Sequence, residues 1–276
     1  MAIKIIGDSC CDFTKLELRK GIHVSVPMSV TIGGIEYRDD GRRTQEDWIR
    51  MIKEDPGYPQ SACPSPDDFY NAFDENCDNY VITLSSKLSG VYNAAMVAKD
   101  MFEDDHEDVN IHIFDSKSAA AGEHLISDMI MECYEAGKSF EETVKEVESF
   151  RDEMFTIFVL DDLETLKKNG RLRGVKALVA TALNVKPVLY GDDGEIKQLD
   201  QAIGMQSAIN RMLYHIEKKK LDPSRKVRIT QCDSKELCLK IAKILTERFG
   251  FTDVKILNAG GISTSYENPG GVVIAM

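Results

Sequence analysis

The stretch NYVITLSSKLSGVYNAA at 79–95 decides how this chain folds. It opens with an apolar run typical of a buried strand, continues through a serine-rich loop that contains a glycine, and ends in a helical pattern. A helix that opens near Ser89 presents unpaired backbone N–H groups, and Ser85, Ser86 and Ser89 add hydroxyl donors. These donors suit a carboxylate or a phosphate. The simpler interpretation, that Ser89 caps the helix and the other two hydroxyls complete the turn, stays open at this point.

The same order of strand and helix recurs through the first half of the chain. We expect strand–helix pairs at 2–7 with 14–20, at 79–84 with 89–103, and at 109–114 with 120–136. Such alternation is typical of a parallel sheet covered by helices on both faces. Local signals add a hairpin turn and three helix starts, at Gly33–Gly34, Thr44 with Asp47, Ser65 before Pro66, and Ser139 with Glu142.

The pattern changes after the apolar run FTIFVL at 155–160. A basic helical segment leads to a hairpin turn at Asp193–Gly194, and the predicted elements that follow are a helix at 204–219, a strand at 226–232, a helix at 234–249 capped by Ser234, a strand at 253–257 and a closing strand at 271–276. We therefore predict two α/β domains, 1–160 with a largely parallel sheet and 161–276 with a mixed sheet. A cleft between them is the natural ligand site.

Composition limits the class of protein. The 276 residues carry 46 acidic and 34 basic side chains, for a formal charge of −12, and lysine and arginine concentrate only in the short KKNGRLRGVK at 167–176. Nucleic acid and anionic membrane surfaces are therefore not expected partners. No segment is long and apolar enough to cross a bilayer, and the chain starts with a strand-like run instead of a signal peptide, so we expect a cytoplasmic protein rather than an integral membrane protein.

Cysteine and histidine spacing does not indicate a metal site or a cofactor. The seven cysteines form no CxxC pair, and the five histidines are scattered. We expect reduced thiols that serve as small apolar or loop residues, including the adjacent Cys10 and Cys11. Neither GxxxxGK[ST] nor GxGxxG occurs in the chain, so a nucleotide site is not expected.

Six separated motifs must be explained together. They are GDSCCDFT at 7–14, QSACPSPDDFY at 60–70, LSSKLSGVYNAA at 84–95, IFDSKSAA at 113–120, LKKNGRLRG at 166–174 and LNVKPVLY at 183–190. In this order they closely resemble the DegV family of bacterial fatty-acid-binding proteins, whose usual forms are roughly TDST, TSQPSP, SSxLSGTY, DS, GRI and IKPIL. The resemblance covers essentially the whole chain.

That resemblance implies a two-domain α/β protein that buries a long acyl chain between its lobes. It also implies a carrier that is not itself an enzyme, because some family members present the bound fatty acid to a separate kinase. Residue by residue, it implies a carboxylate site at Ser61, Ser85, Ser86, Ser89 and Arg171. Candidate residues for the acyl tail are Leu88, Val91, Phe114, Phe158, Leu160, Leu163, Leu166, Leu178 and Leu183.

Three departures from the family pattern bear on function. The TSQPSP motif reads SACPSP here, with Ala62 and Cys63 in place of a hydroxyl and a glutamine. The family's C-terminal HTGPG-like motif reads YENPG, so Tyr266 stands where the family usually has histidine, and Arg171 becomes the main cationic candidate. The stretch 198–211 lacks the basic cluster of family members thought to dock the kinase, which puts a kinase partner in doubt.

Other classes of function stay open from the sequence. A binding protein for a small polar or phosphorylated metabolite could use the strand-end residues Asp8 and Asp115, although both could equally bond the loops that follow their strands. A serine hydrolase built on Ser86 would need a base, and no GxSxG elbow is present. A regulatory protein without a ligand would have a filled core where the acyl cavity should be.

Overall fold

The first large sheet is formed by strands of the N-terminal half of the chain. The computed structural model describes residues 2–173, 175 and 184–276. Within them a four-stranded parallel sheet has the order β2-β1-β6-β7, with β1 at Ala2–Asp8, β2 at His23–Val26, β6 at Cys77–Thr83 and β7 at Ile111–Asp115. These bounds confirm the predicted strands at 2–7, 79–84 and 109–114 to within two residues.

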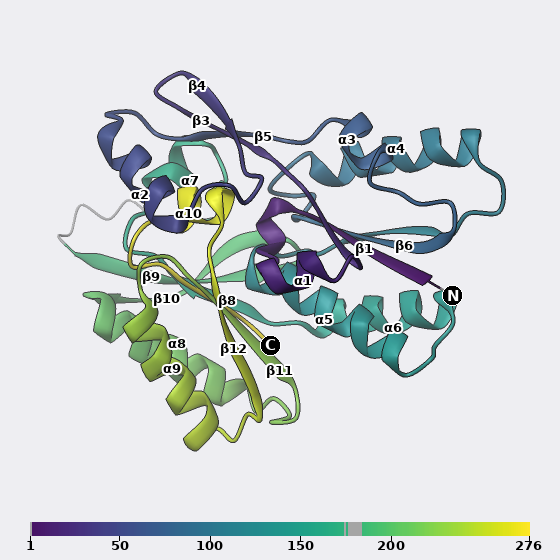
Figure 1. Ribbon diagram of the computed structural model, residues 1–276. Coiled ribbons are helices and arrows are strands. Elements are labelled where there is room, and N and C mark those ends of the chain that lie inside the picture. Colours follow the sequence, from purple (N-terminus) through teal and green to yellow (C-terminus); the bar gives the residue numbers. More distant parts are fainter. Residues whose placement is uncertain (1, 174, 176–183) are drawn as a thin grey trace.

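Helices cover both faces of this sheet because its strands are apolar on both sides (Figure 1). Ile6 and Val81 pack against α4 (Val91–Asp105), whereas Ile5 and Ile82 pack against α5 (Ala121–Glu135) and α6 (Phe140–Glu153). The shorter helical elements of this half are the 3₁₀ turn η1 (Ser9–Cys11), α1 (Lys15–Arg19), α2 (Gln45–Glu54) and α3 (Pro66–Tyr70).

The predicted turn and capping signals in this half are confirmed. Gly33 and Gly34 join β3 (Ser29–Ile32) to β4 (Ile35–Arg38), and β5 (Gln60–Ala62) completes a small antiparallel sheet. Thr44, Ser65 and Ser139 each form a capping box at the start of α2, α3 and α6. Ser89 does not cap α4, because Gly90 occupies that position and no side chain caps the helix.

The second large sheet is mixed, with the order β10-β9-β8-β13-β11-β12. Its strands are β8 (Thr156–Val159), β9 (Val185–Asp192), β10 (Glu195–Ile203), β11 (Lys226–Gln231), β12 (Asp253–Asn258) and β13 (Val272–Ala275). Asp193 and Gly194 form the predicted turn between β9 and β10. Strand β8 belongs to this sheet, so the chain passes from one large sheet to the other before Thr156.

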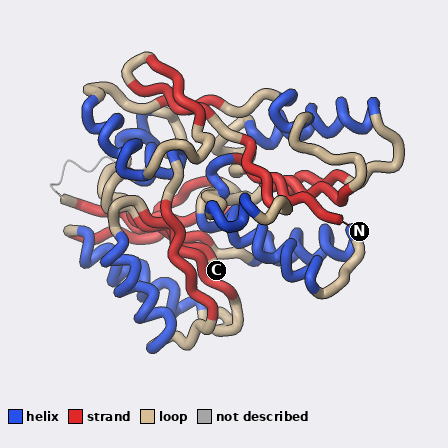
Figure 2. Tube along the Cα trace, in the orientation of Figure 1, coloured by secondary structure: helices blue, strands red, loops and turns tan. Residues whose placement is uncertain are grey.

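Helix α5 lies between the two large sheets, and α8 (Met205–Lys219) and α9 (Lys235–Glu247) cover the outer face of the mixed sheet (Figures 1 and 2). Ile126 and Ile130 of α5 pack on the parallel sheet, whereas Ala121 and Leu125 pack on the mixed sheet. Ser234 precedes α9 as predicted, but its hydroxyl donates to the Gly271 carbonyl (2.8 Å) and does not cap the helix.

Two further helices are short, α7 (Glu164–Lys168) and α10 (Gly261–Glu267). The sequence did not predict α10, because its N-terminus is held by residues of the other half. The backbone N–H groups of Gly261 and Ile262 donate to the Asp39 carboxylate at 2.8 and 2.9 Å. A Cβ on Gly261 would lie 2.5 Å from the buried Trp48 ring, so only glycine fits this contact.

Candidate functional site

A mostly apolar cavity lies beside the N-terminal end of α5, where the two large sheets approach each other. Its volume is about 110 Å³. Its wall includes Ala119 and Ala120 before α5, Phe158 and Val273 of the mixed sheet, and Ile262 of α10. Both halves of the chain therefore contribute to the wall of one cavity.

Four polar side chains gather in one part of this wall, and we call Ser61, Ser89, Arg171 and Tyr266 the donor region. Ser61 lies on β5, opposite Val30 of β3, and Tyr266 lies on α10. Their hydroxyl oxygens are 2.7 Å apart, close enough for one to donate to the other. In a pair of hydroxyls only one proton is used by the mutual bond, so the second proton can be donated to a ligand.

Arg171 brings the positive charge of the donor region. Its guanidinium lies over the Tyr266 ring, 5.6 Å from the centroid, and donates to the carbonyls of Leu88 (3.3 Å) and Asn169 (2.6 Å). Among the residues that the structure describes, none of these contacts is with a carboxylate. Asn169 in turn donates its amide to the Pro59 carbonyl at 2.9 Å, which fixes this loop against the start of β5. A half-buried guanidinium with spare donors is suited to an anion.

The three serines of the 79–95 stretch separate in the structure. Ser89 is half-buried in the cavity wall, with its hydroxyl 3.3 Å from the Cys63 sulfur. Ser85 is fully buried and donates to the Gly194 carbonyl at 2.8 Å. Ser86 is exposed and donates to Asp115. Of these three, only Ser89 faces the cavity.

The predicted tail residues also separate into two groups. Leu88, Phe158, Leu160 and Leu166 line the cavity, and Met28, Ile196, Ile262 and Val273 join them without having been predicted. Phe114 and Val91 are fully buried in cores on the two faces of the parallel sheet, and Leu163 packs beside Leu160 without lining the cavity. Leu178 and Leu183 lie outside the described residues.

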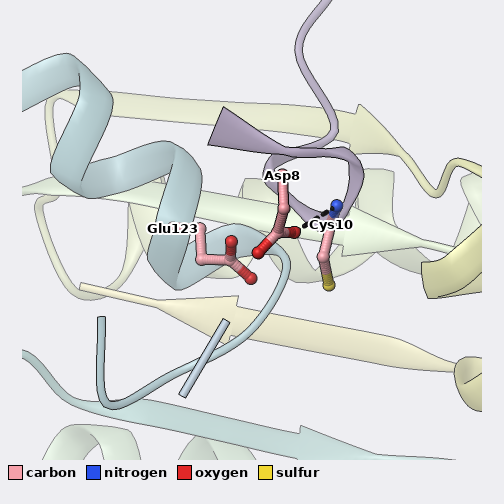
Figure 3. Close-up of side chains that lie close together, drawn as sticks. All are labelled: Asp8, Cys10 and Glu123. Atoms are coloured by element: carbon pink, nitrogen blue, oxygen red, sulfur yellow. Dashed lines mark hydrogen bonds between the residues drawn. The ribbon is translucent and has the colours of Figure 1, made fainter. Parts of the chain in front are cut away.

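A second polar group lies next to the cavity, and we call Asp8, Cys10 and Glu123 the acidic cluster (Figure 3). All three side chains are buried, and Cys10 also lines the cavity. Burial raises the pKa of Asp8 to about 6, even though the backbone N–H groups of Leu84 and Cys10 donate to it. Burial and the charge of Asp8 raise the pKa of Glu123 well above its usual value.

Another buried carboxyl, Glu267, lines the cavity on α10. Neither of its oxygens has a hydrogen-bond partner among the described residues, and burial raises its pKa well above the usual value. Asp115, by contrast, is used by its own loop, where it accepts from the N–H groups of Ser86 and Lys117. The strand-end aspartates therefore bond the loops that follow the strands.

A mostly apolar cavity with a few polar side chains in one part of its wall defines the class, a small-molecule-binding protein of two α/β halves. The chain belongs to the DegV family, since residues 2–276 match the family described as "Uncharacterised protein, DegV family". This confirms the family resemblance and the predicted α/β fold.

Relatives match this chain from end to end. A DegV domain-containing protein of Streptococcus pneumoniae is 29% identical over 99% of this chain and 98% of its own length. A DegV family protein from Ruminococcus gnavus, solved with vaccenic acid, is 35% identical with a TM-score of 0.96 and full coverage of both chains. The Fatty Acid Kinase (Fak) B3 protein of Streptococcus pneumoniae, loaded with linoleic acid, is 28% identical with a TM-score of 0.91, over 100% of this chain and 99% of that one.

No helix among the described residues has both the length and the apolar content that a membrane crossing requires.

Proposed function

We propose that this protein binds one long-chain fatty acid in the cavity between its two halves. The donor region holds the carboxylate, and Leu88, Phe158, Leu160 and Leu166 contact the acyl tail. The observation that carries the proposal is the guanidinium of Arg171, which lies beside the Ser61–Tyr266 hydroxyl pair in a mostly apolar wall. Solved relatives that contain vaccenic and linoleic acid support the same ligand class.

The two parts of the ligand contribute differently. Burying a tail of about sixteen carbons contributes roughly 0.8 kcal/mol per methylene, on the order of 10 kcal/mol before the costs of association. Charge-assisted hydrogen bonds to the carboxylate contribute about 1.5–3 kcal/mol each. The tail therefore supplies most of the affinity, and the donor region fixes which end of the ligand lies near Arg171.

The donor region narrows the carboxylate site that the sequence predicted. Ser61, Ser89, Tyr266 and Arg171 remain in it, whereas the hydroxyls of Ser85 and Ser86 are already donated within the protein. Helix α4 adds the N–H groups of its first turn, which no side chain caps. With a phenol at Tyr266 in place of the family's histidine, Arg171 is the cation that neutralises the ligand.

A carrier role is part of this proposal, and the relative named as the B3 protein of a fatty acid kinase supports it. In the stretch 198–211, Arg211 is the one basic residue, and it lies 3.7 Å from Asp200. The partner that receives the fatty acid from this chain therefore docks with little help from basic charge in this stretch. We place this role in the cytoplasm, in keeping with the reduced thiols that the cysteine spacing predicts.

A small polar or phosphorylated metabolite is the alternative ligand. Such a ligand needs polar partners around its whole surface, whereas much of the cavity wall is apolar and includes Leu84, Leu166 and Val273. The apolar wall therefore favours a lipid.

The test is denaturing extraction of the purified protein, followed by mass spectrometry of the released small molecules. We expect about one long-chain fatty acid per chain. A Ser61→Ala, Arg171→Ala double variant should exchange its bound ligand for added fatty acid faster than the wild type does. The matched control is Ser86→Ala with Arg173→Ala, because Ser86 donates to Asp115 and Arg173 is exposed. An empty wild-type protein that also fails to take up added fatty acid would overturn the proposal.

A further inference from the structure

The acidic cluster brings together three potential metal ligands from distant parts of the chain. One carboxylate oxygen of Asp8, the sulfur of Cys10 and one carboxylate oxygen of Glu123 all lie within 4.8 Å of one another. Within the described residues this is the one group of three or more such side chains that meets this spacing. Figure 3 shows the carboxyl group of Glu123 directed at that of Asp8, with Cys10 beside them.

The backbone fixes the positions of these ligands. Asp8 ends β1, and its two oxygens accept from the N–H groups of Cys10 (2.9 Å) and Leu84 (2.7 Å), which follow β1 and β6. Cys10 is the central residue of η1, and Glu123 lies in the first turn of α5. The end of strand β1, the turn η1 and the first turn of α5 therefore hold these three side chains in place.

One ligand atom has no hydrogen-bond partner among the residues that the structure describes. The Oε1 atom of Glu123 is buried without a hydrogen-bond partner, and Oε2 accepts only from the Cys11 thiol at 3.4 Å. In the part of the chain that the structure describes, neither Asp8 nor Glu123 forms an ion pair. Burying a carboxyl group without a partner costs free energy, and native proteins satisfy such groups with a donor or a cation.

We propose that Asp8, Cys10 and Glu123 form a divalent-metal site with a preference for Zn²⁺. A site with one thiolate and two carboxylates suits a borderline cation, because sulfur disfavours Mg²⁺ and Ca²⁺. Zn²⁺ bonds of about 2.0–2.3 Å place tetrahedral ligands roughly 3.3–3.8 Å apart, so small side-chain rotations close the observed spacing. Cys10 also lines the cavity, and this gives the ion a route to the cluster and a water molecule the fourth position.

Metal binding here has a defined proton balance. Without the metal Cys10 is a thiol and the Asp8 and Glu123 carboxyls share one proton, whereas the ion binds the thiolate and both carboxylates, so two protons are released to solvent when it binds. Three anionic ligands and one Zn²⁺ carry a net charge of −1, so the ion neutralises most of the charge of its ligands. Cysteine and histidine spacing in the sequence could not predict this site, because two of its ligands are carboxylates and Glu123 is more than a hundred residues from the others.

The test uses the full chain, stripped with a chelator and titrated with Co²⁺ as a spectroscopic substitute for Zn²⁺. We expect a thiolate-to-cobalt charge-transfer band that saturates at one equivalent, disappears when Zn²⁺ is added and is accompanied by proton release in weakly buffered solution. Absence of a one-equivalent band in the wild-type protein overturns the proposal. The Asp8 and Glu123 carboxyls would then share a proton in place of a metal.

Two ligand variants and two controls locate the site. Cys10→Ser should abolish the charge-transfer band, and Glu123→Gln should weaken Co²⁺ binding at least 100-fold. Cys63→Ser removes an exposed thiol, and Glu267→Gln alters a buried carboxyl outside the cluster, so both should bind Co²⁺ like the wild type. A band that survives Cys10→Ser or is lost with Cys63→Ser assigns the ion to another thiol and refutes the site. Far-ultraviolet circular dichroism checks that each variant folds, and the wild-type titration decides the question if a variant does not.

This inference does not depend on fatty-acid binding. Metal stoichiometry and the released acyl ligand are measured separately, so either proposal can fail without the other.

Discussion

The donor region and the acidic cluster border the same cavity but differ in what they lack. Around Ser61, Tyr266 and Arg171 there are hydrogen-bond donors and a positive charge with no anion among their contacts in the described residues. Around Asp8 and Glu123 there are buried acceptors, and no side chain in the described part of the chain forms an ion pair with them. Ser263, 3.7 Å from the Cys10 sulfur, and Tyr266 are three residues apart on α10, about 4.5 Å along its axis.

This difference shows that the polarity of a cavity wall does not by itself identify a ligand. The charge of the partner that each region lacks is more informative. An anion completes the donor region and a cation completes the acidic cluster, so one cavity can require two chemically opposite partners. The two regions can be altered separately, and Glu267 and Ser86 belong to neither of them.

Reversing the charge of the donor region should have the largest effect. We expect Arg171→Glu to weaken binding of an eighteen-carbon fatty acid at least about 100-fold, because charge-assisted bonds worth about 1.5–3 kcal/mol are replaced by repulsion. Binding of the methyl ester of the same acid should change by less than about threefold. Displacement of a fluorescent fatty acid measures both, with Arg173→Glu as the control. Equal losses for acid and ester would mean that Arg171 only holds the loop.

Removing the buried carboxyl that belongs to neither region should stabilise the protein. The pKa of Glu267 is raised by burial, so the folded state loses stability as the pH rises from the unfolded value of about 4.5 towards the folded pKa. Glu267→Leu lacks this penalty. We expect the variant to gain about 1–3 kcal/mol over the wild type at pH 8 and much less at pH 5, measured by urea unfolding. A variant less stable than the wild type at pH 8 would show that Glu267 has a partner.

The hydroxyl pair of the donor region should behave as one unit. Ser61→Ala and Tyr266→Phe each remove one member of a 2.7 Å hydrogen bond and should each weaken fatty-acid binding by about 0.5–1.5 kcal/mol. Since either change leaves the other hydroxyl without its partner, the double variant should lose less than the sum of the two. Additive losses in calorimetric titrations would indicate that the hydroxyls contact the ligand independently.

The smallest effect is expected at Ser86. Its hydroxyl donates to Asp115 and its side chain is exposed, so Ser86→Ala should change fatty-acid affinity by less than about twofold, within 0.5 kcal/mol. Ser89→Ala, one turn further along, should weaken binding measurably because Ser89 lines the cavity. If Ser86→Ala weakened binding and Ser89→Ala did not, the carboxylate would lie on the solvent side of the loop.

Local signals in the sequence were sufficient for most of the fold. The strand at 79–84, the Gly33–Gly34 turn and the capping box at Ser139 each depend on neighbouring residues, and the structure contains all three. Helix α10 could not be found in this way, because the Asp39 carboxylate that receives its first N–H groups is 222 residues away. The sheet to which β8 belongs could not be read from neighbouring residues, since its partners β9 and β13 come later in the chain.

The sequence also indicated part of the candidate site. Motif resemblance indicated Ser61, Ser89, Arg171 and Tyr266, which the structure places together in the cavity wall. It also grouped Ser85 and Ser86 with them, because sequence position cannot tell which way each hydroxyl of a turn points. The meeting of Glu123 with Asp8 depends on α5 starting where β1 ends, which is a property of tertiary packing.

Helix α10 has a consequence for the order in which the protein is made. Ile262 and Tyr266 belong to the core of the N-terminal half, and Trp48 closes over Gly261. A ribosome that has completed the parallel sheet has not yet synthesised these residues, so the first half of the nascent chain emerges with an open face. We expect this half to complete its folding only after α10 has left the ribosome, so its core closes well after its own strands have been made.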